Sequence, residues 1–210
     1  MNEHPVSQAY QQFLEGNYNL AAELFEQEIA AYPDLVTNYW YLGLTLLLQG
    51  QEAEAQIMWM TPLLDADLEQ AQVWTNELVT VLQTEVERQR SLAGTLAEKE
   101  DNQHLRTAWA ICQHIREIDA ENVFNLLQLL QLSLELDNPS DRVQILEQIV
   151  DSLRLSPPSA ISGSLVPQVL QQLLDSFPIP LLTFQFARVC LEANFISAEA
   201  LFDMLFAKMR

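Results

Sequence analysis

Residues 39–63 read YWYLGLTLLLQGQEAEAQIMWMTPL and repeat, 34 positions later, a pattern begun in residues 5–33. Five pairs of residues keep this separation: Ala9 and Gly43, Gly16 and Gly50, Ala21 and Ala55, Phe25 and Trp59, Ile29 and Leu63. An internal repeat of this length is typical of stacked helix pairs. The alternative is an ordinary helical bundle whose core residues happen to share the spacing.

The residue types at these positions have a physical reason. Ala21 and Ala55 let the two helices of each copy approach closely, while larger side chains beside them fill the groove. Gly16 and Gly50 stand where the first helix of each copy ends, and glycine suits a left-handed cap there. Pro33 ends the second helix of the first copy, because a proline nitrogen has no hydrogen to donate.

The helical pattern continues after the repeat decays. Pro62 predicts that the fourth helix stops near Thr61, and residues 67–97 are predicted as one long helix with an interruption near Gly94. Residues 98–102 are predicted as a charged break. The helices expected from the pattern are 6–15, 18–31, 35–49, 52–60, 67–97, 105–118, 121–136, 140–153, 165–177, 180–193 and 197–208, the last capped by Ser197.

Composition favours an all-α fold. Five glycines among 210 residues, with much Leu, Ala, Gln and Glu, indicate helices, and 49% hydrophobic residues suffice for a core. We predict a superhelix of antiparallel helix hairpins that is degenerate after the second repeat. Its expected parts are two hairpins in residues 1–66, degenerate hairpins in 67–155, a linker in 156–164 and C-terminal helices in 165–210 that pack on the same array.

Charge is distributed unevenly along the chain. Residues 1–87 contain fourteen Asp and Glu and neither Lys nor Arg, whereas residues 88–210 contain all ten cations and fifteen carboxylates. The first part therefore repels phosphate and anionic membrane surfaces, so we expect neither nucleic acid nor a membrane as partner. A basic or apolar protein or peptide is compatible with it. Simple solubility is the alternative reason for such a charge.

The cellular setting is inferred from what the sequence lacks. No apolar run is long enough for a membrane span, and no secretory signal is visible at the beginning. Cys112 and Cys190 lie within helical patterns and are interpreted as buried thiols rather than as a disulfide. We therefore expect a reducing, cytoplasmic location.

Motifs for chemistry are missing. The glycines do not form a phosphate-binding loop. His104 and His114 lack the i, i+4 spacing of a helical metal pair, and Cys112 and His114 fall on different helix faces. We expect structural histidines, no cofactor, no metal and no catalytic residue, and we interpret residues 58–60 as packing.

The 34-residue period, with its small and aromatic positions, resembles the tetratricopeptide repeat over residues 5–67. The resemblance implies that the first helix of each hairpin lines a concave surface. Family positions on that surface correspond to Val6, Tyr10, Phe13, Trp40, Leu44, Leu47 and Leu48. Members that bind chaperone tails hold a carboxylate there with Lys, Arg and Asn, but this surface has no Lys or Arg, which disfavours that mode. An apolar peptide, the chain's own long helix or a second copy of the chain could cover it.

Residues 10–18, 39–44, 48–55 and 114–118 also resemble the amino-terminal repeat region of certain cyanobacterial proteins. In those proteins the repeats precede a methyltransferase or a SPINDLY-type glycosyltransferase, which is related to O-linked N-acetylglucosamine transferase. The catalytic half of such enzymes is not present in this sequence. The resemblance implies a non-catalytic module that presents protein substrates or mediates assembly.

Three functions follow from these observations. The first is a protein–protein interaction scaffold, the N-terminal substrate- or partner-binding module of a larger transferase. The second is a homodimerising structural module. The third, a stand-alone enzyme, would need a polar pocket in residues 98–210, and no motif supports it.

Overall fold

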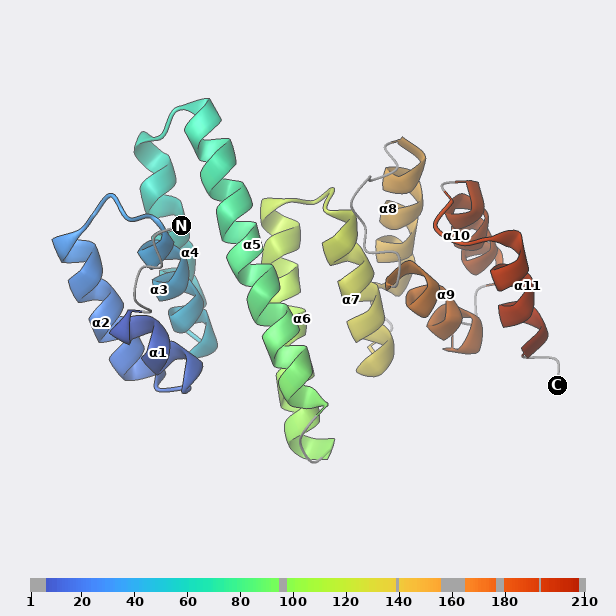
Figure 1. Ribbon diagram of the computed structural model, residues 1–210, viewed down its shortest axis with the longest axis horizontal. Coiled ribbons are helices and arrows are strands. Elements are labelled where there is room, and N and C mark those ends of the chain that lie inside the picture. Colours follow the sequence, from blue (N-terminus) through green and yellow to red (C-terminus); the bar gives the residue numbers. More distant parts are fainter. Residues whose placement is uncertain are drawn as a thin grey trace. The chain divides into compact units, whose positions relative to one another are not determined.

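The computed structural model describes residues 7–94, 98–138, 140–155, 165–176, 180–192 and 194–207. Every regular element in these residues is a helix, and helices that are neighbours in the chain mostly pack against each other (Figure 1). The predicted all-α class is thereby confirmed. The chain divides into two compact units, Met1–Thr84 and Glu85–Arg210, which we call unit 1 and unit 2.

Unit 1 consists of two hairpins and the first part of a long helix. Its elements are α1 (Gln8–Leu14), α2 (Tyr18–Ala31), α3 (Thr37–Leu48), α4 (Glu52–Met60), the 3-10 helix η1 (Thr61–Asp65) and the beginning of α5 (Leu68–Ala93). The helices α2 and α4 have the predicted bounds. Pro62 lies in η1, so α4 stops where the proline predicts.

The two hairpins of unit 1 turn in the same way. Gly16 and Gly50 both have φ of +79°, a left-handed conformation that disfavours any residue with a Cβ atom. In each turn the N–H of the residue after the glycine donates to the carbonyl five residues earlier, at 2.9 Å. This bond satisfies a carbonyl that the end of the helix leaves without a partner. The 34-residue period of the sequence therefore recurs in the backbone hydrogen bonds.

Small residues make the helix contacts in unit 1 close. Ala21 and Ala55 are completely buried. At Gly43 the indole ring of Trp59 lies so near that an added Cβ would meet the Trp59 Nε1 atom at 2.3 Å. The same Nε1 donates to the carbonyl oxygen of Trp40 at 3.2 Å. The backbone of α3 and the aromatic ring of α4 therefore fit together only because residue 43 has no side chain.

Aromatic rings join the first hairpin to the second. The Tyr41 ring on α3 lies 4.9 Å from the Tyr10 ring, 5.8 Å from the Phe13 ring and 5.9 Å from the Phe25 ring. Such centroid distances are those of favourable edge and offset contacts. Tyr41 thus packs against both helices of the preceding hairpin.

Unit 2 contains the end of α5 and six further helices. These are α6 (Glu98–Ile118), α7 (Val123–Glu135), α8 (Arg142–Leu155), α9 (Leu165–Ser176), α10 (Pro180–Glu192) and α11 (Ala198–Ala207). The helix α7 packs against α6, α8 and α9, and α10 packs against α8 and α9. Ser197 caps α11 as predicted, because its Oγ accepts from the Ala200 N–H at 3.0 Å.

The structure corrects the prediction for residues 98–102. They form the beginning of α6 rather than a break. Glu and Lys have high helix propensity, so a charged stretch is compatible with a helix when no glycine or proline interrupts it. The long helix α5 ends at Ala93, immediately before Gly94, where an interruption is predicted.

The boundary between the units also differs from the predicted one, since it lies inside α5 rather than near residue 66. The early part of α5 belongs to unit 1, where the Thr37 Oγ1 donates to the Glu77 Oε1 at 2.6 Å. The later part belongs to unit 2, where the Arg90 Nη1 donates to the Gln131 Oε1 at 2.9 Å. The predicted linker, residues 156–164, lies outside the described residues.

Candidate interaction surface

The groove predicted from the repeat pattern is largely filled by the chain itself. Phe13, Trp40 and Leu44 have at most 2% of their surface exposed, so they belong to the core of unit 1 rather than to an open surface. Tyr10, Leu47 and Leu48 are half-buried, and Val6 lies outside the described residues. The reason is tertiary, because aromatic rings of α1 and α2 and the long helix α5 pack beside α3.

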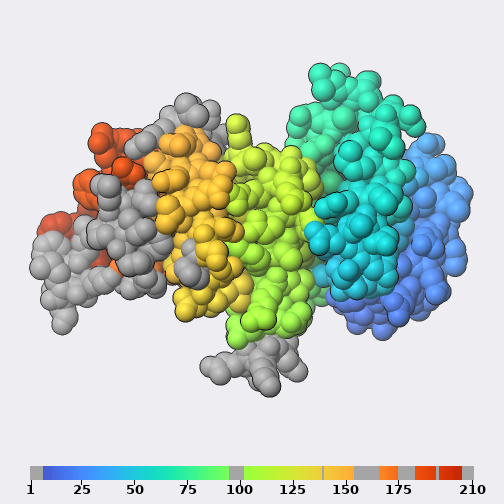
Figure 2. Space-filling view, turned by 180° about the vertical axis from the view of Figure 1, so that it is seen from behind, coloured from blue at the N-terminus to red at the C-terminus, as the bar shows by residue number. Residues whose placement is uncertain are grey.

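A different apolar surface lies at the end of the second hairpin. Four large side chains there are solvent-exposed, and we call them the apolar stripe: Ile57 (59%), Met60 (55%), Leu64 (75%) and Leu68 (90%). They come from α4, η1 and the first turn of α5. In Figure 2 the beginning of α5, in teal, projects at the surface of unit 1. Contiguous exposed apolar side chains are characteristic of interaction sites.

Local structure explains why two of these side chains share one side of α4. Ile57 and Met60 lie at i and i+3, the spacing of a single helix face, and Leu64 follows on η1. The core face of the same segment is formed by Ala55 and Trp59, which are buried. α4 therefore carries apolar residues on two faces, and only one of them is needed for the hairpin.

The sequence analysis missed this surface because it interpreted residues 58–60 as packing. Trp59 is buried as that interpretation requires, but Met60 is exposed. The sequence does contain a signal for this surface. Ile57 and Met60 form a second set of apolar residues at helical spacing in α4, on a different face from Ala55 and Trp59. Periodicity alone does not tell which set faces water.

Carboxylates lie close to the residues of the apolar stripe along the sequence. Glu54, Asp65 and Glu69 are exposed, and Asp67 caps α5 by accepting from the Gln70 N–H at 2.8 Å. Because residues 1–87 contain neither Lys nor Arg, no nearby cation in the sequence offsets this charge. These four carboxylates, which we call the acidic rim, give this part of the chain a negative charge.

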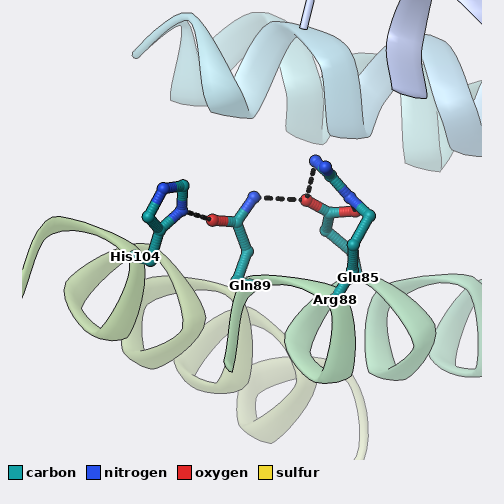
Figure 3. Close-up of polar contacts among 4 residues, drawn as sticks. All are labelled: Glu85, Arg88, Gln89 and His104. Atoms are coloured by element: carbon teal, nitrogen blue, oxygen red, sulfur yellow. Dashed lines mark hydrogen bonds and ion pairs between the residues drawn. The ribbon is translucent and has the colours of Figure 1, made fainter. Parts of the chain in front are cut away.

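Unit 2 holds a cluster of polar side chains that joins α5 to α6 (Figure 3). Arg88 donates from Nε and Nη2 to the two carboxylate oxygens of Glu85, each at 2.7 Å. The Gln89 Nε2 donates to the Glu85 Oε1 at 2.6 Å. His104 Nδ1 lies 2.5 Å from the Gln89 Oε1, which can only accept, so this ring nitrogen carries the proton.

The cluster has a structural explanation. Glu85 and Gln89 are buried, each only 3% exposed, and a buried carboxylate is tolerated when it is paired and hydrogen-bonded. Arg88 supplies the charge and Gln89 the additional donor, while His104 links the pair to the next helix. These side chains form hydrogen bonds and ion pairs with one another, which accounts for their burial.

The two cysteines are free and buried, as predicted. Burial raises the pKa of the Cys112 thiol to about 12, although Arg90 acts in the opposite direction. Burial also raises the pKa of the Cys190 thiol to about 12. Both thiols are therefore protonated at neutral pH, whereas a nucleophile or metal ligand is a thiolate.

Other features of the described residues offer little chemistry. Within these residues, no group of three His, Cys, Asp or Glu side chains is placed to hold a metal ion. A shallow depression of about 710 Å³ is lined by the turn between α2 and α3, including Tyr32, Pro33 and Asp34. All three residues are exposed, so the depression is an open part of the surface. None of the described helices combines the length and apolarity needed to cross a bilayer.

No protein-family model matches the chain, and no curated protein matches its sequence.

Proposed function

We propose that this chain is a non-catalytic scaffold that binds other proteins through unit 1. The observation that carries the proposal is the apolar stripe, since four large side chains exposed within residues 57–68 are unusual on a surface that binds nothing. The hairpins beneath it are held by close packing, which gives a rigid support. A rigid surface loses little conformational entropy when it binds.

The proposal includes the repeat type. The period of 34 residues, the paired glycine turns and the buried alanines support the assignment of the two hairpins to the tetratricopeptide type. The resemblance to the repeat region of SPINDLY-type transferases supports a role in presenting substrates to a larger enzyme. A cytoplasmic location belongs to the same proposal.

The ligand surface in this proposal differs from the concave groove of the sequence analysis. The burial of Trp40 and Leu44 leaves the first helices of the hairpins little surface to offer, whereas the second hairpin exposes α4 and η1. Homodimerisation is the second candidate, because an exposed apolar strip can also be covered by another copy of the chain.

Peptide selection tests the proposal. The full chain is presented to a displayed library of random peptides of about sixteen residues, long enough for about four helical turns. Enriched peptides are then synthesised and titrated against the chain. We expect saturable one-site binding and slower hydrogen exchange in residues 7–84. Light scattering reports the mass of the free chain in parallel.

Two outcomes would contradict the scaffold. One is that no peptide is enriched above a library panned on an unrelated acidic protein. The other is that the free chain is a stable dimer whose dissociation is needed before any peptide binds, which would favour the homodimerising module.

A further inference from the structure

We infer that the apolar stripe binds a basic amphipathic helix of another protein, which lays its apolar face on Ile57, Met60, Leu64 and Leu68 and its Lys or Arg side chains on the acidic rim. This inference rests on the proposed scaffold function and adds the chemistry of the partner and the face it uses.

The form of the stripe favours a helical partner. Ile57 to Leu64 covers eight residues of α4 and η1, and Leu68 follows in the first turn of α5. Exposed side chains at i and i+3 on a helix, such as Ile57 and Met60, form a ridge that fits the grooves of another helix. An extended peptide that binds as an added strand would need an unpaired strand edge, and all regular elements in the described residues are helices.

The charge around the stripe favours a basic partner. Glu54, Asp65, Asp67 and Glu69 are exposed and lie within four residues of a stripe residue in the sequence, and the whole of residues 1–87 lacks Lys and Arg. A partner that brings cations gains attraction with every one of these carboxylates, whereas an acidic or neutral helix does not. The same field would speed the encounter at low salt.

A second copy of the chain fits the rim poorly. Two stripes facing each other would bring like charges together, which costs free energy. Four arginines of unit 2 are already paired with carboxylates of the same unit: Arg88, Arg90, Arg142 and Arg188. Unit 2 as a whole also carries more carboxylates than cations. The partner is therefore a different protein segment.

Two synthetic helices of about eighteen residues test the inference directly. The basic probe has leucine along one face and lysine elsewhere, and the acidic probe has glutamate in place of every lysine. Binding to the full chain is followed by fluorescence anisotropy at about 50 mM and about 300 mM salt. We expect the basic probe to bind, the acidic probe not to bind, and the affinity to fall several-fold at the higher salt.

A double variant locates the binding face. Leu64→Ser with Leu68→Ser should weaken the basic probe about tenfold or more, because it removes two anchors. Leu20→Ser with Phe184→Ser is the matched control, since these side chains are also exposed but lie outside the stripe. We expect the control to bind like the natural chain. Circular dichroism checks that both variants keep their helices.

Methionine methyl signals give a second, variant-free measurement. The Met60 methyl group should shift when the basic probe is added, because Met60 is 55% exposed within the stripe. Met204, half-buried on α11, serves as the internal reference and should not shift.

The possible results separate the inference from the scaffold proposal. If the basic probe binds both double variants equally, the attraction is only one of charge and the inference fails. If library-selected peptides bind but do so without the stripe, the scaffold stands and this inference fails. If neither class of peptide binds, both fail. A dimer that the Leu64→Ser and Leu68→Ser changes dissociate would also overturn the inference.

Discussion

The two units of the chain join helix to helix with different kinds of side chain. In unit 1 the contacts are made by small residues and aromatic rings, as at Gly43 and Trp59. In unit 2 polar side chains bridge neighbouring helices. Asn125 on α7 donates to the Cys112 carbonyl on α6, and Arg90 on α5 pairs with Glu135 on α7 at 3.0 Å.

Burial shows the same contrast. Two of the buried polar side chains in the described residues lie in unit 1 and nine lie in unit 2, so polar groups contribute to the interior mainly in the second unit. The described ion pairs all lie in unit 2, because residues 1–84 contain neither Lys nor Arg.

The difference teaches that one fold class can be specified in two ways. Unit 1 relies on shape, so it tolerates no added atoms at its close contacts. Unit 2 buries more polar side chains, so the loss of a hydrogen-bond partner is costly there. Substitutions of opposite kinds should therefore damage the two units most.

The largest expected effect is at the closest contact of unit 1. Gly43→Ala places a methyl group against the Trp59 ring and should lower the free energy of unfolding by about 3 kcal/mol. Gly94→Ala is the matched control, since the nearest atom to its added Cβ lies 3.9 Å away. It should change stability by less than about 0.5 kcal/mol. Urea unfolding followed by tryptophan fluorescence measures both, and equal midpoints would refute the close-packing account.

The next effect is the loss of a buried hydrogen bond in unit 2. Asn125→Ala removes the donor to the Cys112 carbonyl, 2.9 Å away, and leaves a small cavity. We expect a loss of about 2 kcal/mol. Asn76→Ala on the exposed side of α5 is the control and should be near neutral. A neutral Asn125→Ala would mean that water replaces the amide and that unit 2 does not depend on this bond.

A smaller effect tests whether the two hairpins of unit 1 are equivalent. Gly16→Ala and Gly50→Ala each force a side chain into a left-handed conformation, with no atom within 4 Å of the added Cβ. Backbone strain is then the only cost, and we expect about 1 kcal/mol at each position. Urea midpoints of the two single variants should agree. Clearly unequal midpoints would show that the two turns, although alike in sequence and backbone conformation, contribute differently to stability.

At neutral pH the smallest effect concerns the thiols of unit 2, because it is absent there and develops only in alkaline solution. The pKa of Cys112 and of Cys190 rises from 9.0 to about 12 in the folded chain, mainly by burial. As pH rises above 9 the unfolded chain loses these protons first, so the free energy of unfolding falls between pH 9 and 12 and is unaffected below pH 9. The slope is about 1.4 kcal/mol per pH unit for each thiol.

Urea unfolding at several pH values measures this decline. The variant with Cys112→Ala and Cys190→Ala is the control, because it keeps the tyrosines that also ionise in this range. It should start less stable and lose stability less steeply. Parallel curves for the two proteins would contradict the raised pKa values.

Much of the helix pattern could be predicted from single residues. Pro62 ends α4, Gly16 and Gly50 end their helices, and Ser197 caps α11, because each acts on backbone groups within a few residues of itself. The polar cluster of unit 2 could not be predicted in this way. Gln89 and His104 are fifteen residues apart, and their contact depends on how α5 and α6 pack.

The sequence by itself determined where helices begin and end, the 34-residue repeat and the separation of charge, since these depend on local geometry and composition. Only the tertiary structure decided which apolar side chains are inside. Trp40 and Leu44, which the sequence predicts to line an open groove, lie in the core. Met60, which is interpreted as packing, is exposed to solvent. Helical spacing tells which residues share a face, but the neighbouring helices decide which face they cover.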